Sequence, residues 1–115
     1  MGHGFPKQNK LCGQMLIQRL YREGKHFVSW PLRVTYKPTE DETRVLVWAP
    51  KSLFKHAVDR NRLRRLMREA YRLNQDLLGD AHYQIAFNYI DKEMQPFAVV
   101  EKGICKALKK IGNHQ

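Results

Sequence analysis

The sequence lacks any long run of apolar residues. No stretch of its 115 residues approaches the roughly 18 consecutive apolar residues of a membrane-spanning helix. The first ten residues, MGHGFPKQNK, also lack the apolar core of a secretory signal peptide. We therefore expect a cytoplasmic protein with no membrane partner. Its length predicts a single domain over residues 1–115 with one modest core, and we expect residues 1–9 to be flexible.

Cysteine and histidine are too sparse and scattered to indicate a metal site. Cys12 and Cys105 lie near opposite ends of the chain with no C-x-x-C spacing, and no pair of the five histidines has the spacing of a zinc-binding helix. We expect reduced, buried thiols, with a disulfide as the less favoured alternative. No metal held by this chain is expected.

Known catalytic patterns are also missing. The chain has no G-x-S-x-G, no P-loop and no glycine-rich dinucleotide turn. A protein nuclease would need clustered carboxylates to hold Mg²⁺. The three adjacent acids Glu40, Asp41 and Glu42 lie in one predicted turn, where they are expected to serve solubility. We predict no catalytic residue in this chain.

Acidic residues are scarce relative to basic ones. Lys and Arg number 21 against 11 Asp and Glu, which gives a net charge of +10 and a pI near 9.9. This excess predicts a polyanionic partner, with nucleic acid favoured over an anionic membrane surface. A hydrophobic content of 43% is sufficient for a folded core.

Many of the basic residues lie in residues 55–75, KHAVDRNRLRRLMREAYRLNQ, which predict a single helix. Apolar residues recur there at the spacing of a helix face that packs on a core, namely Leu63, Leu66, Met67, Ala70 and Leu73. At about 100° per residue, a separate arc holds Arg60, Asn61, Arg64, Arg65, Arg68 and Arg72, with Arg62 and Glu69 flanking it. The helix is therefore amphipathic, with a cationic outer face.

This cationic face needs a physical explanation. Like charges at i, i+4 disfavour an isolated helix by a few tenths of a kcal/mol per pair, so we expect a polyanion to offset the repulsion. Guanidinium groups bind phosphate bidentately and stack on bases. A face that is merely solvated is the alternative. The predicted nucleic-acid-binding residues are Lys51, Lys55, Arg60, Asn61, Arg62, Arg64, Arg65, Arg68 and Arg72.

Periodicity predicts an α+β fold of order αβββαβα, a two-layer sandwich with a four-stranded sheet. Helices are predicted over residues 10–22, 55–75 and 96–111, and strands over 26–30, 32–37, 43–49 and 82–90. We expect residues 32–49 to form a hairpin around the acidic turn 38–42, and the strand 43–49 to be central because it is apolar on both faces. The lysines of the last helix are expected to be mostly solvated, with contact to nucleic acid as the less favoured alternative.

The run AVDRNRLRRLMRE, residues 57–69, resembles the signature of the bacterial ribonuclease P protein component, Ala-Val-x-Arg-Asn-Arg-x-Lys/Arg-Arg-x-x-Arg-Glu. The first predicted helix is also similar, since Tyr21 and Gly24 match its aromatic-x-x-Gly end. Lys55 departs from the family, which usually has a glycine there, and leaves the turn geometry open. The resemblance implies a left-handed βαβ crossover around the arginine-rich helix, an exception to the right-handed rule.

The resemblance also implies a function. Such a protein binds a catalytic RNA and helps it remove the 5′ leader from precursor transfer RNA, while the RNA holds Mg²⁺ and performs the chemistry. The implied cleft for the single-stranded leader comprises Ile17, Tyr21, Arg33, Thr35 and Lys37. Ile17 replaces an aromatic residue of the family, so stacking there would be lost.

The same residues are also consistent with plainer interpretations. Ile17 and Tyr21 fit equally well as core residues, and the strand positions fit an ordinary solvated sheet face. The chain could also be another small basic RNA-binding protein, such as a ribosomal protein. A stand-alone nuclease would have to cleave RNA without any RNA subunit. We expect no DNA partner, because no turn and second helix flank the arginines as in DNA-binding domains.

Overall fold

The structure is a computed structural model that describes residues 14–113. Its elements are α1 (Gln14–Glu23), β1 (Lys25–Ser29), β2 (Leu32–Pro38), β3 (Arg44–Trp48), α2 (Ala57–Asn74), a short 3₁₀ helix η2 (Gln75–Leu78), β4 (Tyr83–Tyr89) and α3 (Phe97–Gly112). The predicted order αβββαβα is therefore confirmed. Three predicted features lie outside the described residues: the flexible segment 1–9, the start of the first helix at Lys10, and Cys12.

The four strands form a mixed sheet of order β1-β2-β4-β3. β1 and β2 form an antiparallel hairpin, β2 pairs antiparallel with β4, and β3 pairs parallel with β4. The predicted hairpin over residues 32–49 is wrong, because β4 lies between β2 and β3. β3 is likewise an edge strand and not a central one. Its connection to β4 runs through α2, and the left-handed crossover implied by the resemblance remains a prediction.

The side chains of β4 explain why it takes the central position. Tyr83, Ile85, Phe87 and Tyr89 alternate along it and are buried toward α2 and α3, while Ala86 is buried on the opposite face. A strand buried on both faces is stable only between two neighbours that satisfy its backbone. The strand 43–49 is apolar too, but most of its residues are only partly buried. Apolar content alone did not distinguish these two strands.

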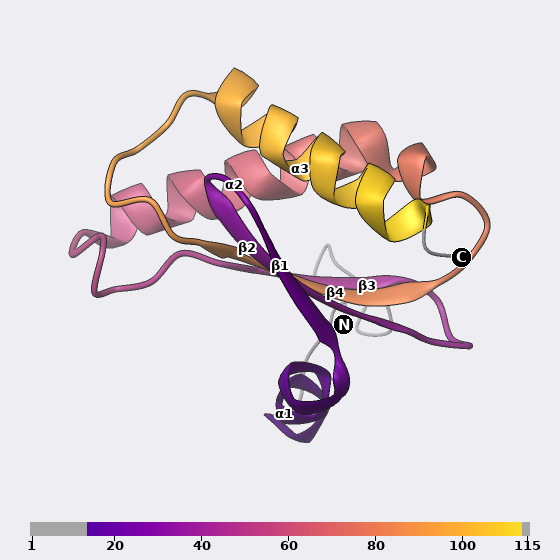
Figure 1. The fold of residues 1–115 in the computed structure, drawn as a ribbon. Coiled ribbons are helices and arrows are strands. Elements are labelled where there is room, and N and C mark those ends of the chain that lie inside the picture. The colour runs from indigo at the N-terminus through magenta and orange to yellow at the C-terminus, as the bar shows by residue number, and fades with distance from the viewer. Residues whose placement is uncertain (1–13, 114–115) are drawn as a thin grey trace, which may run out of the picture.

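The helices occupy both faces of the sheet (Figure 1). α2 and α3 lie side by side on one face and form the second layer, and α1 lies against the other face. The main core lies between the sheet and the pair α2–α3, and includes Leu63, Met67, Ile104 and Leu108 from the helices. One face of the sheet is therefore largely covered, whereas α1 covers only part of the other.

The apolar face predicted for α2 is mostly confirmed. Leu63, Met67 and Ala70 are fully buried and Leu66 is partly buried against the core. Leu73 is an error, because 54% of its surface is exposed. It lies at the edge of the apolar arc, next to the polar flank that carries Glu69, and the core does not extend that far round the helix.

α1 reaches the sheet through a small apolar cluster of its own. Leu20 packs against Ala86 of β4, and Leu16, Ile17, Tyr21 and Leu46 surround them. Gly24 ends the helix, as predicted, and lies very close to β2. A Cβ atom there would lie 2.5 Å from the carbonyl oxygen of Leu20 and 2.8 Å from that of Tyr36.

Gly24→Ala is therefore expected to destabilise the protein. The added methyl group would collide with two backbone carbonyls, and overpacking of this kind typically costs about 1–3 kcal/mol. Urea unfolding followed by circular dichroism measures the effect, with the exposed α1 substitution Gln18→Ala as control. Equal stability of the two variants would contradict the close contact between the end of α1 and β2.

Candidate nucleic-acid interface

The start of α2 is held by one of the predicted nucleic-acid-binding arginines. Arg60 donates hydrogen bonds from Nη1 to the carbonyl oxygens of Phe54 (2.8 Å) and Lys55 (2.9 Å). His56 is the N-cap residue, with extended backbone angles and no side-chain cap bond. Arg60 therefore shapes the loop that presents Lys55, and only part of its guanidinium is left for a ligand.

The next turn of α2 brings two arginines together. Arg64 donates from Nη2 to the side-chain oxygen of Asn61. Partial desolvation by neighbouring atoms, and then the charge of Arg64, lower the pKa of the Arg68 guanidinium from its usual value. Arginine still remains protonated at neutral pH. Repulsion between these neighbouring cations is relieved when an anion binds between them, as expected for a phosphate site.

Five predicted cations on and before α2 have exposed side chains whose charged groups form no hydrogen bond or ion pair within residues 14–113. They are Lys51, Lys55, Arg62, Arg65 and Arg68. Long flexible cations without acidic partners are free to bind phosphates without first breaking an internal contact. We call this set, together with Arg64, the cationic face of α2.

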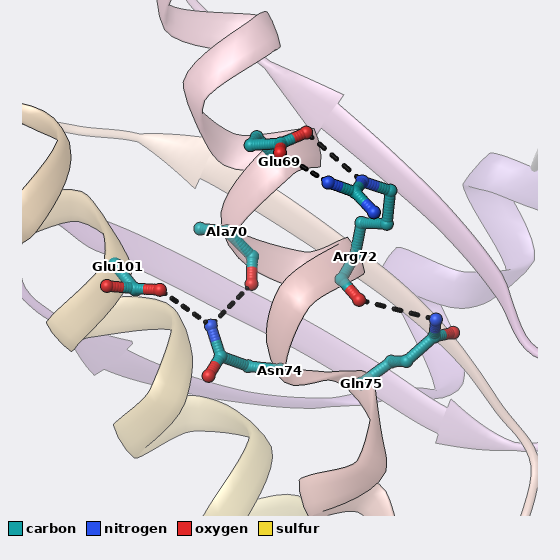
Figure 2. Close-up of polar contacts among 6 residues, drawn as sticks. All are labelled: Glu69, Ala70, Arg72, Asn74, Gln75 and Glu101. Carbon is teal, nitrogen blue, oxygen red and sulfur yellow. Dashed lines mark hydrogen bonds and ion pairs between the residues drawn. The ribbon is translucent and has the colours of Figure 1, made fainter.

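Arg72, at the end of the helix, is different (Figure 2). Its Nη2 and Nε atoms lie 2.5 Å and 3.2 Å from the two carboxylate oxygens of Glu69, and this bidentate contact lowers the pKa of Glu69 and raises that of Arg72. The cationic outer face predicted from the sequence therefore ends before Arg72, where a basic and an acidic side chain are paired. Close by, Asn74 joins α2 to α3 through Glu101 at 3.1 Å.

The sheet face that α1 only partly covers carries a second row of side chains, most of them exposed. Residues in register across the four strands share one face, and one such row consists of Val28, Arg33, Asn88 and Trp48. Val28 is 63% exposed and Trp48 is 52% exposed, and Arg33 is exposed as well. An aromatic ring, an amide and a guanidinium in one line are suited to the bases and phosphates of a single strand. We call this row the open-face row.

Tyr21 of α1 borders the open-face row. Asn88 donates from Nδ2 to the Tyr21 hydroxyl at 2.9 Å, which links α1 to β4. The ring of Tyr21 stacks on that of His26, with centroids 6.5 Å apart and planes 13° from parallel. Because the carbonyl oxygen of Tyr21 can only accept, His26 donates to it from Nε2 at 3.0 Å. Tyr21 is thus positioned from two sides.

The residues predicted for the leader cleft have different surroundings. Arg33 is exposed, and Tyr21 and Ile17 are partly buried at the base of α1. Lys37 forms an ion pair with Glu23 at 2.6 Å. Thr35 is completely buried and its hydroxyl lies 2.8 Å from Nδ1 of His26, so it is wrongly placed in the predicted surface.

Sequence reasoning missed Val28 and Trp48. Trp48 was assigned to a central strand, where an aromatic residue is an ordinary core residue. The signal that could have found it is the alternation Arg44, Leu46, Trp48, which places the tryptophan on the same face as a charged residue. Val28 could not be recognised in this way, because its exposure follows from the limited reach of α1 across the sheet.

Among residues 14–113, the structure has no group of three or more His, Cys, Asp or Glu side chains able to hold a metal ion. None of the helices in this range is long and apolar enough to cross a membrane. Cys105 is a free, partly buried thiol, and burial raises its pKa, which keeps it protonated at neutral pH. Neither it nor any described histidine suggests a catalytic cluster.

Comparison with solved structures gives the same fold. The ribonuclease P protein of Thermotoga maritima superposes with a TM-score of 0.78 at 22% identity, covering 89% of this chain and 96% of that protein. The ribonuclease P protein of Staphylococcus aureus has a TM-score of 0.75 at 18% identity, covering 91% of this chain and 95% of that protein.

Sequence comparison identifies the family. A protein of Porphyromonas gingivalis named ribonuclease P protein component is 37% identical over 96% of this chain and 88% of its own length. One of Clostridioides difficile with the same name is 34% identical, over 82% of this chain and 83% of its own length. The family model described as Ribonuclease P matches residues 5–112. The chain therefore belongs to the ribonuclease P protein family.

Proposed function

We propose that this chain is the protein subunit of ribonuclease P and assists removal of the 5′ leader from precursor transfer RNA. The observation that carries the proposal is the cationic face of α2, six basic side chains with no acidic partner among the described residues, in a member of this family. These cations would bind phosphates and sugars of the catalytic RNA, reading its shape more than its sequence.

We assign the chemistry to the RNA. The side chains gathered on the two surfaces are guanidinium, ammonium, amide and aromatic groups, which bind phosphates and bases. In our proposal Mg²⁺ and the reacting groups belong to the RNA subunit, and the protein supplies affinity and screens charge. We propose that the protein acts in the cytoplasm.

The open-face row is the proposed path of the single-stranded leader. Trp48 offers a ring for base stacking, Arg33 a cation for a phosphate, and Asn88 an amide for a base edge or sugar. Trp48 is also the last residue of β3, directly before the loop that carries Lys51 and Lys55. The leader and the catalytic RNA would therefore meet at the β3 edge of the sheet.

Adding the purified protein to a bacterial ribonuclease P RNA at low Mg²⁺ is expected to restore cleavage of precursor transfer RNA. The protein alone is expected to leave the substrate intact. Gel analysis of the cleaved leader measures both reactions, with an unrelated basic protein of similar charge as control. Cleavage by the protein alone would contradict the assignment of chemistry to the RNA. Equal stimulation by the control protein would indicate a generic RNA-binding protein.

A further inference from the structure

A hollow with the composition of a nucleic-acid site lies at the opposite edge of the sheet from β3. It has a volume of about 450 Å³ and lies between β1 and α3. Its lining residues are Phe27, Val28, Ser29, Trp30, Val99, Lys102, Lys106 and Lys110. No acidic residue is among them. We call it the β1–α3 groove.

One wall of the β1–α3 groove is a row of lysines. Lys102, Lys106 and Lys110 follow one another at i, i+4, i+8, so they project from the same side of α3. All three are exposed, and none forms an ion pair with an acidic residue within residues 14–113. Lys110 Nζ lies 4.5 Å from the centre of the Phe27 ring, which directs it into the groove. A polyanion would relieve the repulsion along this row.

The other wall is apolar and exposed. Trp30 is 55% exposed, and Val28, which also belongs to the open-face row, is 63% exposed. The spacing between the two walls is set by close packing deeper in the groove. Ser29 donates from its hydroxyl to the carbonyl oxygen of Gly103 at 2.7 Å, and a Cβ atom at Gly103 would lie 2.8 Å from the carbonyl oxygen of Trp30.

The groove continues the path proposed for the leader. Val28 belongs both to the open-face row and to the lining of the groove. A single-stranded RNA that starts beside Trp48 and crosses Asn88 and Arg33 arrives at Val28 on β1, which is the edge strand of the sheet. Beyond that edge, the next side chains in its path are Trp30 and the lysines of α3. An aromatic residue beside a row of cations is the usual composition of a single-strand binding groove.

We propose that the β1–α3 groove binds the part of the 5′ leader furthest from the cleavage site, with phosphates on the lysines and a base against Trp30. This inference rests on the proposed function, because it needs the leader to cross the sheet. A four-stranded sheet is about 14 Å wide. At a stacked rise of about 3.4 Å per nucleotide, about four nucleotides cross it, and only a longer leader reaches α3.

The test compares holoenzymes assembled with wild-type protein and with Lys102→Gln/Lys106→Gln, using precursor transfer RNAs with leaders of about four and about ten nucleotides. Lys92→Gln/Lys109→Gln is the matched control, since it removes the same charge from exposed lysines that do not line the groove. The measurement is the Kd for each substrate by filter binding, at several salt concentrations.

For the long leader, Lys102→Gln/Lys106→Gln is expected to raise Kd about tenfold at moderate salt and to reduce the slope of log K against log salt by about 1.4, at about 0.7 per lost phosphate contact. The short-leader substrate should bind as it does to wild type. Trp30→Leu, which keeps an apolar wall but removes the stacking ring, should weaken only the long leader.

Three results would overturn the proposal: no change with the long leader, an equal loss with both leaders, or an equal loss in the control variant. An acidic protein as the true occupant would give the first of these. Failure of the proposed function looks different, because the wild-type protein would then not stimulate cleavage even of the short-leader substrate.

Discussion

Replacing Arg65 and Arg68 together with alanine is expected to weaken binding of the catalytic RNA at least tenfold at moderate salt, and to reduce the slope of log K against log salt by about 1.4 to 1.8. Both guanidinium groups are exposed and unpaired within residues 14–113, so removing them deletes phosphate contacts and frees no internal partner. The loss should be similar for RNAs of different sequence, because phosphate contacts carry no base information. Fluorescence titration at several salt concentrations provides the measurement.

Arg72→Ala is the matched control for the single variant Arg68→Ala, since each removes one arginine from α2. The Arg72 guanidinium, unlike that of Arg68, already binds Glu69 through two atoms. We expect the Kd for RNA to change by less than about threefold, because the Arg72 guanidinium is already bound to the Glu69 carboxylate and is not free for a phosphate. Equal losses from Arg68→Ala and Arg72→Ala would show that net charge, and not the cationic face of α2, governs RNA binding.

The parts of the fold that depend on local pattern were predictable. α2 was recognised because its apolar and basic residues recur with a helical period, and a period is a property of neighbours in sequence. The same holds for the alternation of β4 and for the stop of α1 at Gly24. In each case, burial in the structure follows the pattern except at the margin, where Leu73 shows that a helical wheel gives the direction of a side chain but not the extent of the core.

Strand pairing was not predictable in the same way. Residues 32–49 read as a hairpin because two adjacent strands with a short turn usually pair. The structure instead inserts β4, which lies more than thirty residues further along the chain, between β2 and β3. Which strand pairs with β2 depends on which strand can bury side chains on both faces at the centre of the sheet. The competing strands, β3 and β4, lie far apart in the chain. The error hid Trp48, whose exposure follows from the edge position of β3.

The site residues were recognised by type but not by surroundings. Arg60, Arg68 and Arg72 are equivalent in the sequence pattern, yet one holds the loop before α2, one is free and one is paired with Glu69. Thr35 alternates with Arg33 and Lys37, which are exposed and partly exposed, but it is fully buried, with its hydroxyl 2.8 Å from Nδ1 of His26. What separates them is the set of neighbouring acceptors, which only the folded chain defines.

Met67→Asp is expected to unfold the protein. Met67 is fully buried between α2 and the sheet, where the apolar core offers no cation or cluster of donors for a carboxylate. An unpaired buried charge costs several kcal/mol, which is comparable to the whole stability of a domain of this size, about 5–15 kcal/mol. Circular dichroism should show loss of the cooperative thermal transition.

The matched control is Leu73→Asp, the same type of change at a position further along the same helix. Because Leu73 is largely exposed, the new carboxylate stays in water and should cost no more than about 1 kcal/mol, part of it from a negative charge near a helix C-terminus. A folded Met67→Asp, or an unfolded Leu73→Asp, would place the helix in a different rotation about its axis. The cationic face of α2 depends on that rotation, since turning the helix so that Met67 faces water would carry Arg65 and Arg68 round toward the sheet.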